Sequence, residues 1–368
     1  MGSRGDGNRG AGCRGCPWGE AQRARPHPVR TGQTSRQALV ASAGLAREAD
    51  SLGYTRYWVA EHHNMTAVAS SVPGVLIPYL AAGTSRIRFG SGGVMLPNHA
   101  ALAIAEQFAL LEAMYPGRID LGIGRAPGSD PVTAYLLRGG AQGAGVDTFE
   151  QDVTLAQALL GIGGEPGDAV GISISGRPYE LRATPRGETS PDLWLLGSSD
   201  YSADLAARLG LPYVFANHFG MPGLEMALAR YRASYTPSES YPEPQTLLPV
   251  NVVVGETDDE ARALAATYVV QMVRLRTGAP MGPQLTVEEA AEYPWSENER
   301  ALAEQVPAGW YVGTVDDVAS RLRETAERHR VDEIMISPVA GARAGDPLDA
   351  VPARIATLRA LAGELLGA

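Results

Sequence analysis

The strongest constraint on the fold is an alternation of apolar runs and amphipathic segments that continues along most of the chain. From Thr31 onward, runs of strand length alternate with segments whose apolar residues recur at helical spacing. Continuous apolar strands separated by helices indicate a parallel sheet covered on both faces, either a doubly wound sheet or a closed barrel. The strand-like runs after Thr31 are RYWVAEH (56–62), IRFGSGGVML (87–96), IDLGIGRAP (119–127), DLWLLGSS (192–199), YVFANHF (213–219), LLPVNVVVG (247–255) and EIMISPV (333–339).

The number of strands separates these two architectures. One further strand before Thr31 would make eight, which favours the (β/α)8 TIM barrel, whose active site lies at the carboxyl ends of the strands. Two stretches, residues 163–191 and 277–313, interrupt the alternation and are expected as insertions at strand ends. Residues 1–30 are rich in Gly, Arg and Pro and lack periodicity, so we expect a poorly ordered N-terminal segment before a barrel over residues 31–368.

Charge and hydropathy argue against two classes of partner. The chain has 31 Lys and Arg against 41 Asp and Glu, so it does not offer the clustered cations that nucleic acid requires. Its apolar runs are shorter than the roughly 20 residues that span a bilayer, and its Gly- and Arg-rich start differs from a secretory signal. We therefore expect a cytoplasmic protein that acts on small molecules, with no nucleic-acid or membrane partner.

Histidine and cysteine supply the candidates for a metal site. Metal-binding barrels often take two ligands from one strand as H-x-H, because side chains on one face recur with period two. His62 and His63 are adjacent and should point opposite ways, and His99 and His218 do not restore the pattern. The CRGC stretch at 13–16 lacks further nearby ligands. We therefore predict no metal ligands, and a purely structural role for these histidines stays open.

Two polar stretches at predicted strand ends are candidates for cofactor phosphate. GIGRAPG (122–128) departs from the dinucleotide fingerprint, since its sixth residue is Pro127 and no helix opens directly behind it. LLGSSDYSADLAARLG (195–210) places hydroxyls where a strand passes into a helix, a position that binds anions, although the same residues also serve as ordinary helix N-caps. Arg125 offers the counter-charge for a phosphate there.

These stretches together resemble the bacterial luciferase-like monooxygenases, a flavin-dependent (β/α)8 family. The similarity runs from about Thr31 to the C-terminus. It is carried by RYWVAEHHN (56–64), by the long run from GSGGVMLPNHA to GIGRAPG (90–128), by LLGSSDYSADLAARLGLPYVFANHF (195–219) and by WYVGTVDDVASRL (310–322). Family members usually begin with an apolar strand, whereas GEAQRARPH precedes PVRTGQT here. Either the first strand is atypical or this N-terminus is not the natural one.

The resemblance implies a role for each candidate residue. His62 would lie beside the reactive edge of the flavin, with His63 and Asn64 shaping the pocket. A bend with a non-prolyl cis peptide would support the isoalloxazine ring from behind. The residues implied in cofactor binding are Gly92 and Gly93 at this bend, Asn98 at the ring or ribityl chain, and Arg125, Ser198, Ser199 and Ser202 at the phosphate.

The activity implied is that of an FMN-dependent monooxygenase. Reduced flavin (FMNH2) from a separate reductase would react with O2 to give a C4a-(hydro)peroxide that oxygenates a hydrophobic organic substrate, such as a secondary metabolite. Tyr57, Phe215 and Phe219 are expected around the mouth of the pocket, and a homodimer is expected. Two alternatives remain: hydride transfer with the deazaflavin F420, and a non-catalytic flavin-binding protein.

Overall fold

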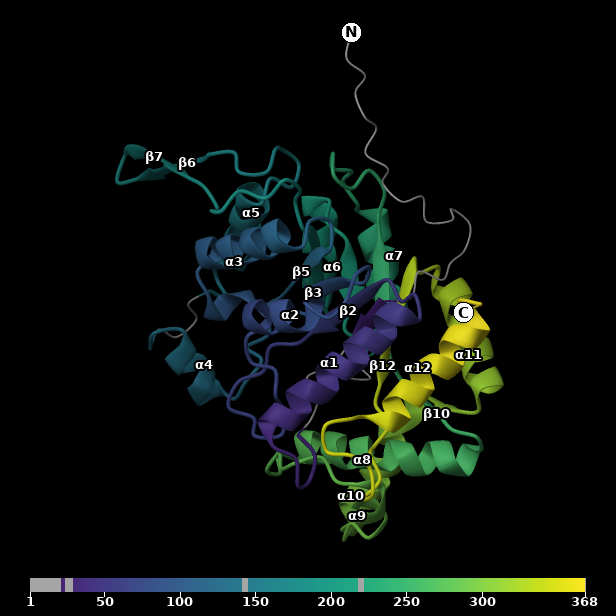
Figure 1. The fold of residues 1–368 in the computed structure, drawn as a ribbon. Helices are drawn as coiled ribbons and strands as arrows, with labels where there is room; N and C mark the ends of the chain where they lie inside the picture. The colour runs from purple at the N-terminus through teal and green to yellow at the C-terminus, as the bar shows by residue number, and fades with distance from the viewer. Residues whose placement is uncertain (1–20, 24–28, 141–144, 218–221, 368) are drawn as a thin grey trace.

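Eight parallel strands form a closed barrel in the computed structural model, which describes residues 21–23, 29–140, 145–217 and 222–367 (Figure 1). Neighbouring strands pair in chain order, and the pairings of β10 with β9 and of β1 with β12 close the ring. The barrel strands are β1 (Ala21–Arg23), β2 (Arg56–Val59), β3 (Arg88–Ser91), β5 (Ile119–Gly124), β8 (Asp192–Gly197), β9 (Tyr213–Phe215), β10 (Thr246–Val254) and β12 (Glu333–Pro338). The predicted (β/α)8 barrel is thus confirmed.

The eighth strand is the short β1. Its Ala21 pairs with Met335 of β12 and with Arg56 of β2, so β1 fills the gap between the first and last strands of the regular pattern. Its sequence, Ala-Gln-Arg, lacks the apolar run by which the other seven were recognised. Cys13 and Cys16 lie outside the described residues.

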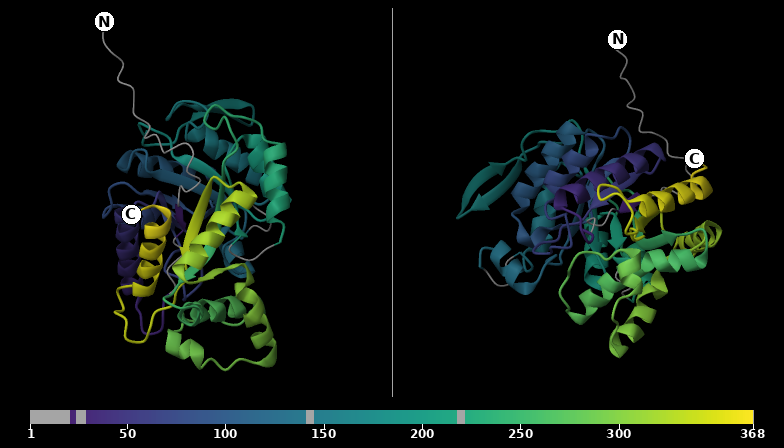
Figure 2. Two further views of the ribbon diagram at one scale, coloured as in Figure 1. Left: turned by 90° about the vertical axis from the view of Figure 1, so that its right-hand side faces the viewer. Right: turned by 60° about the horizontal axis from the view of Figure 1, so that its bottom comes forward.

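Helices surround the barrel and cover the outer face of the sheet (Figures 1 and 2). Thr34 begins the first of them with a capping box, in which its hydroxyl and the Gln37 side chain each bond the other's backbone N–H. These helices are α1 (Ser35–Ser51), α2 (Pro73–Ala81), α3 (Ala101–Met114), α5 (Phe149–Leu159), α6 (Asp200–Leu209), α7 (Leu224–Ala233), α8 (Asp258–Thr277), α11 (Val315–His329) and α12 (Pro352–Leu365). Among the described residues, none of the helices has the length and apolar character needed to cross a bilayer.

The two interruptions of the sequence pattern are folded insertions. Residues 163–191 contain an antiparallel hairpin, β6 (Val170–Ile174) and β7 (Arg177–Leu181), which stands out from the barrel (Figure 2). Residues 277–313 form α9 (Val287–Ala291), α10 (Glu297–Gln305), the 3-10 turn η3 (Val306–Gly309) and β11 (Tyr311–Gly313), and α9 and α10 pack beside α8 (Figure 1). Sequence periodicity did not identify α5, α11 or the short α4 (Pro131–Leu137). In α4, Val132 and Leu136 are exposed, so no buried stripe marks the helix.

A buried ionic network occupies the amino ends of the barrel strands. The Arg56 guanidinium lies 3.0 Å from Asp120 and 2.9 Å from Glu333, and Arg88 lies 2.7 Å from Asp120 and 2.8 Å from Asp192. The Trp58 indole also donates to Asp120 at 2.7 Å. These strand-initial charges therefore connect β2, β3, β5, β8 and β12 at the end of the barrel opposite the expected active site.

The network contains three carboxyl groups but only two guanidinium groups. Burial acts to raise the pKa of Asp120, but Arg56 and Arg88 outweigh it and hold that pKa below its usual range. Burial raises the pKa of Glu333 to about 7, against the opposing effect of Arg56. A protonated Glu333 balances the remaining charges, since two carboxylates then face two guanidinium groups.

We predict that Asp120→Asn lowers the free energy of unfolding by about 3–5 kcal/mol, because it removes the fully buried carboxylate that both guanidinium groups contact. Glu333→Gln should lower the free energy of unfolding far less at pH 5.5, because the neutral amide then replaces a carboxyl group that is protonated in the folded protein. The folded-state pKa of Glu333 lies above its ordinary 4.5. The stability that protonated Glu333 contributes to the fold is therefore complete below about pH 4.5 and is lost as the pH rises through about 7. Urea unfolding at pH 5.5 and 8 measures both effects.

Asp259→Asn is the control, since Asp259 is exposed and pairs only with Arg262 in the described structure; it should change stability by about 0.5 kcal/mol or less. Equal losses for Asp120→Asn and Asp259→Asn would contradict the importance assigned to the network.

Candidate functional site

A cavity of about 1130 Å³ opens at the carboxyl ends of the barrel strands. Ligand pockets in proteins commonly measure about 300–1,000 Å³, so this one has room for a cofactor together with an organic substrate. Each contributing strand end supplies wall residues: Ala60 and His62 after β2, Gly93 and Met95 after β3, Gly124 and Arg125 at β5, Gly197 and Ser198 at β8, Ala216 after β9, and Pro338 and Val339 at β12.

Most of the remaining wall is apolar or aromatic. Tyr135 comes from α4, Phe149 from α5, Tyr201 from α6, and Tyr268 with Met272 from α8. The expectation that Tyr57 and Phe215 surround the mouth is wrong. Both are fully buried in the hydrophobic core and do not line the cavity. Phe219, like His218, lies outside the described residues.

The two adjacent histidines take different surroundings. His62 lines the cavity, and its backbone N–H donates to the Ser70 carbonyl at 3.0 Å. His63 is absent from the cavity wall; its Nε2 lies 2.8 Å from Glu61 Oε1. The alternation of side chains along extended backbone thus separates the pair, as the sequence predicts.

The predicted bend follows β3. The peptide bond between Gly92 and Gly93 is cis, and the Gly92 N–H donates to the Val59 carbonyl at 2.7 Å. Gly93 lines the cavity, whereas Gly92 does not. A Cβ at position 93 would lie 2.9 Å from the Gly122 carbonyl oxygen of β5, and backbone there has little room to move, so glycine is required.

Arg125 and the predicted serines gather at one side of the cavity. The exposed Arg125 guanidinium lies over the Tyr201 ring, 4.2 Å from its centroid. Ser198, Ser199 and Ser202 all line the cavity. Ser199 occupies the N-cap position of α6, yet its side chain makes no capping hydrogen bond. The free N–H groups of the first helical turn therefore face the same region as a cation and hydroxyl groups.

Ser202 and Asn98 are engaged within the protein. The buried Ser202 hydroxyl donates to the Ser199 carbonyl at 2.7 Å. Asn98, in the 3-10 turn η1 (Leu96–Asn98), donates to the Pro127 carbonyl at 2.9 Å and accepts from Arg138 at 3.2 Å. Asn98 does not line the cavity, although Arg138 does. Asn98 therefore connects the segment after β3 to the loop after β5.

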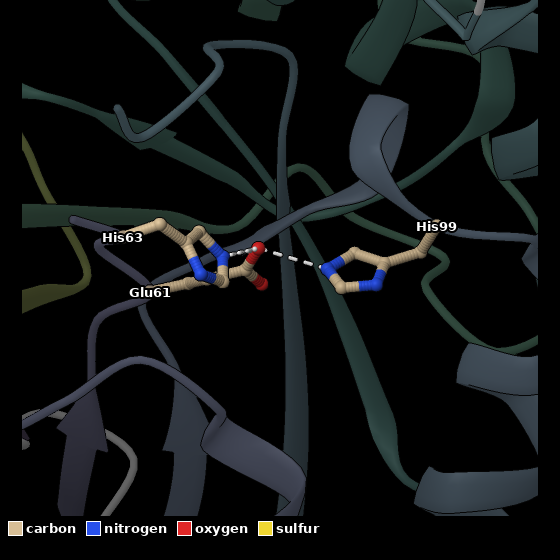
Figure 3. A group of neighbouring side chains, drawn as sticks. All are labelled: Glu61, His63 and His99. Atoms are coloured by element: carbon tan, nitrogen blue, oxygen red, sulfur yellow. Dashed lines mark hydrogen bonds and ion pairs between the residues drawn. The ribbon is translucent and has the colours of Figure 1, made fainter. Parts of the chain in front are cut away.

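Glu61 is the residue that sequence reasoning did not single out for a role. It is 1% exposed, and its Oε1 accepts from Nε2 of both His63 and His99 at 2.8 Å (Figure 3). Its Oε2 accepts from the Met95 N–H at 3.1 Å. Burial acts to raise the pKa of Glu61, but the hydrogen bonds from His99 and His63 outweigh it and keep that pKa below its usual range. An acidic residue directly after a buried strand was the signal available in the sequence.

The donor set fits a phosphate-bearing cofactor. A guanidinium, two hydroxyl groups and an uncapped helix N-terminus provide the charge and N–H donors that bind phosphate. The same cavity is also lined by Gly93, by His62 and by the apolar wall.

Comparison with known proteins agrees with this geometry. The family model for luciferase-like monooxygenases matches residues 23–333. This chain belongs to the luciferase-like monooxygenase family. It is accordingly a flavin-dependent monooxygenase built on an α/β barrel.

Three relatives illustrate the similarity. A luciferase-like monooxygenase of Escherichia coli strain K12 is 40% identical over 310 residues, which cover 84% of this chain and 88% of that protein. The N-acetyl-S-alkylcysteine monooxygenase of Bacillus subtilis strain 168 is 32% identical over 314 residues, covering 84% and 89%. The crystal structure of apo-MsnO8 is similar with a TM-score of 0.78 and 35% identity, covering 94% of this chain and 99% of that one.

Proposed function

We propose that this luciferase-like monooxygenase uses FMN, receives it in reduced form from a separate reductase, and oxygenates a hydrophobic organic substrate. The observation that carries the proposal is the composition of the single cavity described above. One end presents Arg125, Ser198 and Ser199, and the same space reaches His62 and an apolar wall. A bound FMN phosphate at the first end would direct the rest of the cofactor toward the second.

Each part of the cavity has a task in this proposal. Arg125, the two serines and the N-terminus of α6 would bind the phosphate. Gly93 would let the flavin ring approach the backbone of the bend, since it carries no side chain. Reduced FMN, when bound, supplies the electrons that activate O2. The apolar wall would exclude water, and His62 would hold or move a proton at its imidazole while oxygen is activated.

Two features of the chain support the separate reductase and the apolar substrate in this proposal. GIGRAPG does not meet the dinucleotide fingerprint, which supports delivery of reduced flavin by another protein. Tyr135, Phe149, Tyr268 and Met272 favour a substrate with an apolar body. One relative is named an N-acetyl-S-alkylcysteine monooxygenase.

F420 is the alternative cofactor, because its phosphate would fit the same donors and its reaction would transfer hydride without oxygen. A non-catalytic flavin-binding protein is the other alternative, and His62 in the cavity wall argues against it. Oxygen consumption by the loaded protein separates F420-dependent hydride transfer from a monooxygenase. Formation of an oxygenated product separates a non-catalytic flavin-binding protein from a monooxygenase.

We predict that the protein binds FMN, more tightly when the FMN is photoreduced, and that Arg125→Ala weakens this binding about ten- to hundredfold. A charge-assisted contact to phosphate contributes about 1.5–3 kcal/mol. The melting temperature should change little, because among the described residues the exposed Arg125 contributes only its stacking on Tyr201 to the fold. Fluorescence titration of both proteins measures the affinities.

Arg262→Ala, at an exposed arginine with no place in the cavity, is the matched control and should bind FMN normally. Binding of F420 but not of FMN by the wild type would overturn the choice of cofactor. An unchanged affinity with a lower melting temperature would show that Arg125 serves the fold.

His62→Ala should bind reduced FMN almost as well as the wild type but release hydrogen peroxide faster after mixing with O2. A positioned acid–base group contributes about 10²–10⁴-fold, so a change of this order is expected in the release rate. His63→Ala is the control: its imidazole contacts Glu61 and not the cavity, so it should change the rate less and stability more. Equal acceleration by both substitutions, or more by His63→Ala, would show that the roles of the pair are reversed.

We also predict a homodimer that associates through α2 and α3. These two helices are neighbours on the outside of the barrel (Figure 1). They expose large apolar side chains, with Val75 70%, Tyr79 48%, Leu110 46% and Met114 46% exposed. Light scattering should report twice the 38.8 kDa chain mass, and Val75→Glu combined with Leu110→Glu should halve it. A monomeric wild type would refute this association.

A further inference from the structure

The Glu61 carboxylate connects the segment after β2 to the segment after β3, both of which contribute to the cavity wall. It follows β2 and precedes His62, which lines the cavity. Its Oε2 accepts from Met95, which lies two residues after Gly93 and also lines the cavity. Its Oε1 accepts from His99, which follows η1, and from His63 (Figure 3). One carboxylate thus joins the segment that carries His62 to the bend that carries Gly93.

The loop after β5 packs against the same two segments that the Glu61 carboxylate joins. The His63 N–H donates to the Gly128 carbonyl at 3.1 Å. A Cβ at Gly128 would lie 2.8 Å from the Glu61 carbonyl oxygen and 2.9 Å from Met95 Cγ, and the φ of Gly128 is +64°. The loop that begins at Arg125 therefore packs closely against both Glu61 and Met95.

The negative charge of Glu61 stabilises this arrangement of the segments after β2 and β3. A buried carboxylate is costly unless hydrogen bonds compensate it, and here three N–H donors do so. If one donor moves away, part of that cost returns, so the segments after β2 and β3 resist separation. The hydrogen bonds also account for the convergence of Glu61, His63 and His99 without a bound cation.

We infer that Glu61 is a positioning residue for the reaction, one that holds His62 and the Gly92–Gly93 bend at a set spacing. This inference rests on the proposed function, because the spacing matters only if a flavin lies between His62 and the bend. Glu61 does not line the cavity itself, so it acts through its neighbours. Misplacement of reacting groups by about 1 Å costs on the order of 10²-fold in rate, which gives such a residue its importance.

The test compares Glu61→Gln with Glu112→Gln, which makes the same change at another buried carboxylate. Glu112 is 0% exposed, accepts from the Gly117 N–H and from Thr189, and does not line the cavity. Without flavin, Glu61→Gln should speed amide hydrogen exchange in residues 91–99, and Glu112→Gln should not. With FMN bound, Glu61→Gln should alter the visible circular dichroism of the flavin and speed peroxide release about tenfold or more.

Two results separate this inference from the proposed function. A wild type that binds no FMN refutes the proposed function, while the exchange rates still test whether Glu61 holds the bend. If Glu61→Gln lowers the melting temperature as Glu112→Gln does and changes neither exchange nor the flavin signals, the positioning role is refuted.

His99 provides a second test that avoids removing the buried charge. His99→Ala deletes one donor, whereas His99→Gln keeps an N–H at the distance of Nε2 and should restore wild-type exchange and peroxide release. Identical behaviour of the two variants would overturn the inference. So would a melting temperature that rises with added Zn²⁺ in the wild type and not in His99→Ala, because the three side chains would then be metal ligands.

Discussion

Closure of the parallel sheet into a ring is the constraint on which the rest of the molecule depends. The pairings of β9 with β10 and of β1 with β12 satisfy the edges of the sheet and bring all eight carboxyl ends to one rim. Residues far apart in the chain, such as His62, Arg125 and Ser198, become neighbours of one cavity for that reason. The short β1 matters for closure because it joins β2 to β12.

The two ends of the barrel differ in how they handle buried charge. At the amino ends, Arg56, Arg88 and three carboxyl groups balance one another in contact, which leaves no capacity for a ligand. At the carboxyl ends, Glu61 is compensated by its own donors, while Arg125 extends over Tyr201 into the open cavity. A closed network makes the amino end of the barrel rigid. Arg125, whose partner within the described residues is the Tyr201 ring, is suited to bind an anion.

Local sequence predicted the positions of site residues correctly where the residue type meets a requirement of the backbone at that position. The paired glycines at 92 and 93, the adjacent histidines at a strand end and the serines before α6 all stand where predicted. The prediction failed for Tyr57 and Phe215, because strand residues alternate between the barrel interior and the helix layer, and an apolar run on both faces does not show which side a given ring takes. Asn98 lay near the site in sequence, but its amide bonds Pro127 and Arg138 and is turned from the cavity.

The sequence by itself determined the order of the seven apolar strands and of most helices between them, the barrel class and the strand ends at which polar residues gather, since these depend on periodicity and on neighbours along the chain. Only the tertiary structure decided that Glu61 joins His99 and Met95, and that Tyr268 and Met272 of α8 complete the cavity wall. Such contacts depend on the register and closure of the sheet, which place residues more than thirty positions apart within hydrogen-bonding distance. No pattern within a single segment contains that information.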